Sequence, residues 1–247
     1  MSSTSTAVRR DSGAWFLTTH WSVVLASGQS DTPRAAEALQ RLCQAYWYPL
    51  YTYVRRRGYS PHDAQDLTQG FFAHLLQHDA MTKVDPAKGK FRSFLLASMN
   101  HFLSDECDKS RAQKRDGGKS ISLDLESAET RYLQQADDPL TAEKTFERRW
   151  ALTLLEQVYE RLRQDYGREG KGDVFETLRF SLMGERSAVP YTELARRLNM
   201  NEGAVKVAVH RLRHNYRKRL RAQIAETVAT PEEVEEELRC LLRALAS

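Results

Sequence analysis

The spacing of apolar residues along the chain is that of α-helices almost throughout. Apolar side chains recur three and four positions apart from residue 32 onward, and no stretch of any length alternates polar and apolar residues as a strand does. Proline at a first helical position and serine or threonine caps mark several helix starts. The pattern therefore predicts an all-α fold.

A stretch rich in glycine, serine and charge interrupts the helical pattern at residues 115–138. Such a composition is typical of a linker. We therefore expect two helical modules, 32–114 and 139–225, joined by a flexible linker. Residues 1–31 form an N-terminal extension, and residues 226–247 form an acidic C-terminal helix.

Residues 191–220 predict two helices joined by a tight turn, the second of them strongly basic. Asn199 suits the left-handed position that ends the first helix, and Asn201 suits the cap of the second. From residue 201 to residue 221 the chain carries seven Lys or Arg residues and one Glu. A two-helix unit with a basic second helix is the shape that enters a DNA major groove. The alternative is a solvated basic face on an ordinary helical hairpin.

A second basic patch, residues 108–119, follows a helix that contains Phe91, Phe94 and Phe102. Basic residues beside aromatic rings suit single-stranded nucleic acid, because unstacked bases lie on the rings and phosphates meet the cations. The three rings equally fit a hydrophobic core.

Composition excludes several classes of protein. No run of about 18 apolar residues occurs, and the N-terminus has no signal-peptide core, so we expect a cytoplasmic protein with no membrane contact. The three cysteines are odd in number and far apart, which disfavours a disulfide framework or a zinc site.

An enzyme is the weakest alternative. His74 and His78 have metal-ligand spacing, but no Glu completes an HExxH motif. The chain has no glycine-rich phosphate loop and no GxSxG nucleophile motif. We therefore expect no catalytic residue, no metal and no cofactor.

Three stretches, in this order, resemble a bacterial RNA polymerase sigma factor of the extracytoplasmic-function (ECF) type. "YVRRRGYSPHDAQDLTQGFFAHLL" is similar to regions 2.1–2.2 of that family, and "KGKFRSFLLASMNHFLSDECDKSRAQKR" to regions 2.3–2.4. "YTELARRLNMNEGAVKVAVHRLRHNYRKRL" is similar to region 4.2. The likeness covers roughly residues 35–115 and 145–221.

The resemblance implies a protein that binds core RNA polymerase, at the β′ coiled coil and the β flap, and directs promoter-specific initiation. The polymerase would supply the chemistry. By position, the residues that face the −35 element are Asn201, Lys206, Val207, His210, Arg211, Arg213 and Arg217. Those that handle the −10 element are Asn100, Asp105, Lys109, Arg111, Lys114 and Arg115. Those that dock on the polymerase are Asp63, Asp66, Gln69 and Phe72. The alternative function is a helix-turn-helix regulator that acts without binding core polymerase.

The polymerase-docking stretch departs from the family pattern. Gln65 and Gly70 stand where carboxylates are usual, so two negative charges are missing. A phosphate on nearby Thr68 would add about 1.5 to 2 negative charges. We hypothesise that a Ser/Thr protein kinase activates the protein at Thr68; the alternative is an ordinary surface threonine. An anti-sigma factor is a further candidate partner.

The C-terminal helix carries an apolar stripe and, from residue 226 to residue 247, six Glu and two Arg residues. Thr230 and Glu233 form a capping box at its start. The favoured interpretation is a helix packed onto region 4. The alternative is an acidic guard lying near the basic recognition helix.

Overall fold

The computed structural model describes residues 33–77, 90–112, 125–134, 139–182, 189–228 and 230–246 of the 247-residue chain. These ranges contain helices and connecting loops but no strand, which confirms the all-α prediction. The helices are α2 (Pro33–Arg56), α3 (Pro61–Gln77), α4 (Phe91–Ala112), α5 (Leu125–Leu133), α6 (Ala142–Arg168), α7 (Gly172–Leu178), the 3-10 helix η3 (Arg179–Leu182), α8 (Tyr191–Leu198), α9 (Glu202–Ala225) and α10 (Pro231–Ala246).

A first core forms where α2, α3 and α4 meet. Local signals set the start of α3: Gly58 has a φ of 94° after α2, and the Ser60 hydroxyl accepts a hydrogen bond from the Asp63 amide at 3.1 Å. The Ser60 side chain therefore caps α3. Buried residues on the three helices recur at helical spacing; they include Tyr46, Leu50, Tyr53, Ala64, Phe71, Leu75, Phe91, Leu95, Met99 and Leu103.

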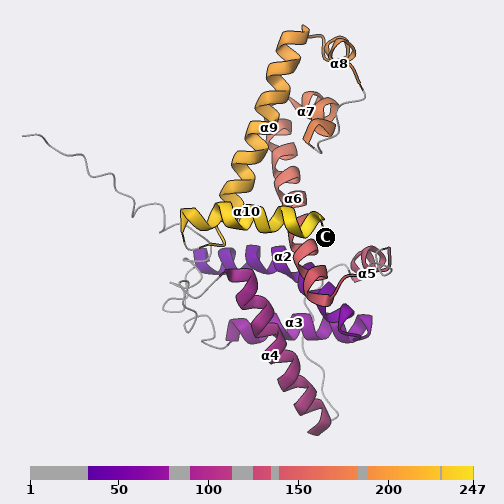
Figure 1. The fold of residues 1–247 in the computed structure, drawn as a ribbon, viewed down its shortest axis with the longest axis vertical. Coiled ribbons are helices and arrows are strands. Elements are labelled where there is room, and N and C mark those ends of the chain that lie inside the picture. Colours follow the sequence, from indigo (N-terminus) through magenta and orange to yellow (C-terminus); the bar gives the residue numbers. More distant parts are fainter. Residues whose placement is uncertain are drawn as a thin grey trace, which may run out of the picture.

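Helix α6 joins this core to a second one. Its first half packs on α2 through Phe146, Trp150, Leu154 and Val158, and α2 and α6 form the most extensive helix pair among the described residues. Its second half enters the second core at Leu162. In Figure 1, α6 runs as one helix from beside α2 up to α7.

The second core contains the C-terminal half of α6, α7, α8 and the first half of α9; its buried residues are Leu162, Phe175, Leu178, Leu194, Ala195, Val205, Val209 and Leu212. Helix α9 then returns to the first core through Leu220 and Ile224. Between the two cores, the Tyr216 hydroxyl donates to the Leu155 carbonyl at 3.3 Å, and burial raises the pKa of Tyr216 to about 12. Two helices thus connect cores that the sequence placed in separate modules.

The predicted linker contains a helix. Helix α5 lies within residues 115–138 and packs on α2, with Ala128 buried. The Glu129 carboxylate accepts from Arg55 at 2.8 Å and from the Tyr51 hydroxyl, and Arg55 lies over the Tyr132 ring. The composition of this stretch is typical of a linker. The contacts that stabilise α5 come from α2, far away in the sequence, so no local pattern indicated the helix.

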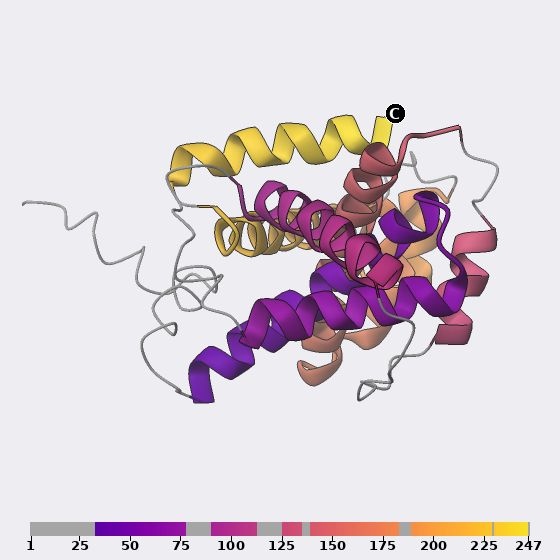
Figure 2. The same cartoon turned by 90° about the horizontal axis from the view of Figure 1, so that it is seen from below.

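Helix α10 docks at a place that the sequence did not indicate. It contacts α6 and α9, as the favoured interpretation expects, but its buried residues Val234, Leu241 and Ala244 belong to the first core. Figure 1 shows it lying across α6 and α9, and Figure 2 shows it along one outer side of the molecule. Helix α9 extends about 36 Å from its cap, Asn201, and α10 follows at the opposite, C-terminal end of α9. Helix α10 therefore lies against the C-terminal end of the basic recognition helix, where Glu235 pairs with Arg221, a position that both interpretations allow.

We expect the Glu129–Arg55 pair to stabilise the docking of α5. Replacing Glu129 with Gln should lower the free energy of unfolding by about 1 to 3 kcal/mol, because it removes a charge-assisted pair that is largely shielded from water. Glu156→Gln is the matched control: its pair with Arg131 is exposed, and its loss should cost no more than about 1 kcal/mol. Chemical denaturation measures both.

The same pair predicts a pH dependence. Burial raises the pKa of Glu129, but the hydrogen bonds from Arg55 and Tyr51 outweigh burial and hold the pKa below its ordinary value of 4.5. A lowered pKa means that the stabilisation is present above pH 4.5 and is lost as the pH falls through the folded-state value. Glu129→Gln should therefore flatten the acid side of the stability curve; an unchanged acid side would contradict this assignment.

Candidate nucleic-acid interface

The two helices predicted from residues 191–220 form as expected. Helix α8 ends at Asn199, whose φ of 51° is left-handed, and α9 is capped by Asn201, whose side chain accepts from the Ala204 amide at 2.7 Å. Both cap predictions are confirmed. Leu194 and Val205 are buried where the helices cross, and Met200 packs against the same core.

The outer face of α9 is open. Lys206, Val207, His210 and Arg211 are all exposed, and 49% of Val207 is accessible, which is unusual for an aliphatic residue. The Lys206 ammonium lies 5.8 Å from the centre of the Tyr191 ring. Cationic, imidazole and aliphatic side chains on one helical face can contact both phosphates and base edges.

A groove of about 700 Å³ runs beside this face. Val207, His210 and Arg211 line one side, and Tyr166 and Lys171 from the end of α6 and the following turn line the other. His214 also lines it, and its ring stacks on His210 with centroids 6.5 Å apart. Sequence reasoning missed His214 as a candidate residue, although its spacing of four from His210 was visible. Lys171 could not be placed there because its position depends on α6.

Two predicted contact residues at the C-terminal side of this face differ in their surroundings. The Arg213 guanidinium donates to the Ser181 carbonyl at 2.9 Å, so it helps to hold η3 against α9. Arg217 is exposed and makes no hydrogen bond or ion pair with any described residue. Arg217 is therefore available to an external anion, whereas Arg213 is partly committed to the fold.

The residues predicted for the −10 element are only partly described. Asn100 is half-buried and accepts a hydrogen bond from the Tyr53 hydroxyl at 2.6 Å, which ties it to α2. Asp105 is exposed on α4. Lys109 and Arg111 lie in the last turns of α4 but their side chains fall outside the description, as do Lys114 and Arg115 altogether. Of the three phenylalanines on α4, Phe91 is fully buried and Phe94 and Phe102 pack against the core, as the core alternative expects.

The residues predicted to dock on a polymerase separate into two pairs. Asp63 and Asp66 are exposed on α3, whereas Gln69 and Phe72 are buried. The expectation that Gln69 and Phe72 offer a surface is therefore wrong for this structure. A side chain at Gly70 would place its Cβ 3.4 Å from the Phe102 ring, so the missing carboxylate there coincides with a close approach of α3 and α4.

Thr68 is fully buried, and its hydroxyl donates to the Ala64 carbonyl at 2.7 Å. The alternative of an ordinary surface threonine is therefore wrong. It shares one face of α3 with Ala64 and Phe71, which are four and three residues away. A kinase can reach this hydroxyl only when α3 has moved away from its neighbours.

The described part of the chain offers no group of three His, Cys, Asp or Glu side chains placed to hold a metal. His74 is exposed, and its proposed partner His78 lies outside the described residues. None of the described helices is both long and apolar enough to span a bilayer.

Residues 42–113 match the family model of Sigma-70 region 2. The matched residues lie in α2, α3, α4 and the segments between them, and they make up less than a third of the chain. The match supports a sigma factor, a non-enzymatic protein that binds RNA polymerase and takes part in promoter melting. Searches of curated proteins and of solved structures found no match.

We expect Arg213 and Arg217 to differ when each is replaced by Ala. Arg213→Ala should lower the free energy of unfolding by about 0.5 to 1.5 kcal/mol, because the bond to Ser181 is lost. Arg217→Ala should change it by no more than about 0.5 kcal/mol. Equal effects of the two substitutions in thermal unfolding would show that Arg213 has no structural role.

Proposed function

We propose that the chain is a sigma factor of the ECF type, which binds core RNA polymerase and directs promoter-specific initiation. The observation that carries this proposal is a Sigma-70 region 2 match on α2–α4 combined with a helix-turn-helix at the other end of the molecule. In this proposal α3 docks on the β′ coiled coil, α4 handles the −10 element, and the α8–α9 unit docks at the β flap and reads the −35 element.

The exposed face of α9 supports the assignment of −35 recognition. Lys206, Val207, His210 and Arg211 lie where base edges would be met, and Asn201 lies at the helix N-terminus, where phosphates bind. Arg217 lies two turns further along and would contact backbone phosphate. Arg213 would reach DNA only by sharing its guanidinium with Ser181.

The direct test is transcription in vitro with core polymerase, with mapping of the start sites. We expect defined starts that require the protein. Asp66→Asn should weaken binding to core polymerase about 2- to 5-fold at low salt, because one exposed charge of the docking helix is lost. Glu176→Gln on α7 removes the same charge from an exposed site remote from α3 and should leave binding unchanged.

DNA binding without any binding to core polymerase would replace the proposal with its alternative, a helix-turn-helix regulator that acts alone. If the Asp66 and Glu176 variants bound core polymerase equally well, α3 would be rejected as the docking helix. The mapped start sites would still decide whether the protein directs initiation.

We further propose that a Ser/Thr protein kinase controls the protein through Thr68, with an anti-sigma factor as another candidate regulator. A phosphate cannot occupy the buried site of the Thr68 hydroxyl without displacing its neighbours, since it adds three oxygens and about 1.5 to 2 negative charges. Phosphorylation would therefore hold α3 in a displaced position and add charge beside Asp66.

Polymerase binding by three forms tests this control. The phosphorylated protein should bind more tightly than the unmodified protein, because the added charge complements a basic surface. Thr68→Val is the matched control, since it keeps the volume of the buried side chain and cannot be phosphorylated; it should bind like the unmodified protein. Binding as tight in the unmodified and Val forms as in the phosphorylated form would end the proposal.

A further inference from the structure

Helix α10 carries one carboxylate inside its apolar face. Val234, Leu241 and Ala244 are buried against the first core, and Glu237 lies between them at helical spacing, three residues after Val234 and four before Leu241. Only 2% of Glu237 is accessible, whereas its neighbours Glu235 and Glu236 are exposed. A fully buried glutamate needs cationic partners, because an unpaired charge in the core is strongly destabilising.

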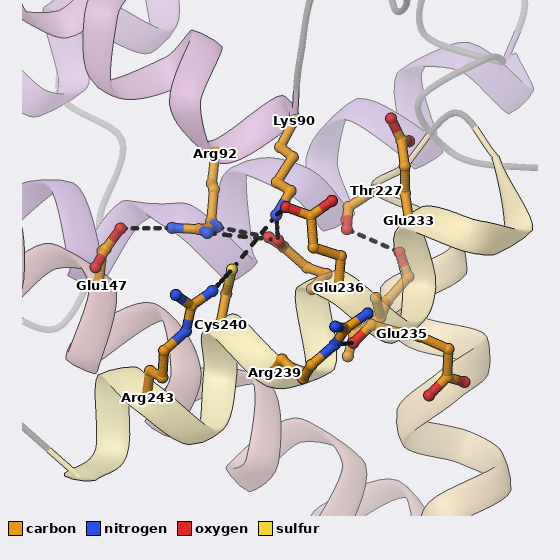
Figure 3. A network of polar contacts seen from close by, with 12 residues as sticks. Lys90, Arg92, Glu147, Thr227, Glu233, Glu235, Glu236, Arg239, Cys240 and Arg243 are labelled. Carbon is orange, nitrogen blue, oxygen red and sulfur yellow. Dashed lines mark hydrogen bonds and ion pairs between the residues drawn. The ribbon is translucent and has the colours of Figure 1, made fainter.

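The partners of Glu237 come from the start of α4. The Arg92 Nε lies 2.5 Å from one carboxylate oxygen, and the Lys90 Nζ lies 2.9 Å from the other. Arg92 also pairs with Glu147 of α6 at 2.8 Å and lies over the Trp150 ring. Figure 3 shows the side chains of Arg92 and Lys90 converging between Glu147 and α10. One arginine therefore joins α4, α6 and α10.

The ion pair of Glu237 with Arg92 determines the position in which α10 docks. It contributes less to the free energy of docking. Desolvation offsets most of the Coulomb energy of a buried ion pair, so its main effect is to select one geometry. An apolar side chain at position 237 would pack on many surfaces, but a carboxylate is accommodated only beside Lys90 and Arg92. When α10 detaches, the three charges regain water, which makes the detached state less costly than it would be for a wholly apolar face.

Helix α10 also holds the end of α9. Glu235 pairs with Arg221, and α10 packs on α9 at the point where Leu220 and Ile224 enter the first core. The end of α9 is thereby held against α6 and α10 in the first core, and α9 carries the helix-turn-helix at its other end.

We propose that α10 is a detachable clasp. It docks on the surface around Lys90 and Arg92, a surface fitted to an acidic amphipathic helix, and while docked it holds the helix-turn-helix in one position relative to α2–α4. Its release frees the end of α9 and lets the helix-turn-helix move. The consequence for promoter binding rests on the proposed function; the clasp itself does not.

Hydrogen exchange of the full chain tests the docking, with Glu237→Gln and Glu236→Gln as a matched pair. Both substitutions remove one negative charge from adjacent positions of α10. Glu237→Gln should speed amide exchange in α10 at least ~10-fold, because it leaves Arg92 and Lys90 without their buried partner. Glu236→Gln should change it less than about 3-fold, because Glu236 is 55% exposed.

Exchange elsewhere separates release from unfolding. Exchange in α3 and α8 should stay as in the unsubstituted protein. If Glu237→Gln speeds exchange throughout the first core, Lys90→Gln provides the milder variant, since it removes the weaker partner; it should speed exchange in α10 alone. Unchanged exchange of α10 in both the Glu237 and Lys90 variants would overturn the clasp.

The position of the helix-turn-helix is the second measurement. Two fluorophores attached through non-cysteine handles at the exposed residues His101 and Thr192 report the distance between α4 and α8 in single molecules. We expect one narrow distance distribution for the unsubstituted chain and Glu236→Gln, and a broader one for Glu237→Gln. An unchanged distribution in a variant whose α10 exchanges rapidly would overturn the proposal. Neither measurement involves polymerase, so a failure of the proposed function would appear separately, in transcription.

Discussion

The packing of α6 on α2 is the constraint on which the rest of the structure depends. Helix α6 is 27 residues, so it extends about 40 Å. Phe146 and Trp150 near its start are buried against α2, and Leu162 near its end is buried in the second core. Because one continuous helix belongs to both cores, α6 limits how far one core can move against the other, and the end of α9 in the first core is the second connection between them. The helix-turn-helix and the C-terminal end of α4 therefore lie at opposite ends of the molecule (Figure 1).

Two ion pairs then fix the elements that apolar packing leaves undetermined. Arg55 with Glu129 positions α5, and Arg92 with Glu237 positions α10. In each pair the guanidinium also lies over an aromatic ring, that of Tyr132 or Trp150, which lysine could not do as well. Helix α5 has 9 residues and α10 has 16, and each docks a narrow apolar face that could settle on several surfaces. The buried carboxylate specifies one of them.

How far the sequence predicts this structure follows from the range of each interaction. The Ser60 cap, the left-handed Asn199 and the Asn201 cap depend on residues three or four positions away, and all are confirmed. The docking sites of α5 and α10 depend on residues 74 and 145 positions away, and no local pattern indicates them. The same limit explains Gln69 and Phe72, whose burial is decided by where α3 packs.

Thr68 is an instructive exception, because its burial could be read locally. It stands four residues after Ala64 and four before Phe72, on the buried face of α3. A hydroxyl in this position is tolerated because it donates to the carbonyl one turn earlier, so it satisfies itself without any tertiary partner. Because threonine was treated as a polar residue, Thr68 was not included in the predicted apolar stripe of α3.

The polar groups of the first core lie on two sides of α2. Thr68 and Gln69 are on α3, whereas Arg92 and Glu237 join α4 to α10, and Figure 1 draws α3 and α10 on opposite sides of α2. A partner that contacts Asp63 and Asp66 on α3 therefore does not compete with α10 for space. Any coupling between them must pass through the aromatic interior of α2, where burial, and then the nearby Glu237 charge, raise the pKa of Tyr46. Such a close-packed interior transmits displacement of one face to the other, since it has little free volume to absorb it. Displacement of α3 and release of α10 would thus take place on different sides of α2, and α2 is the helix through which one could affect the other.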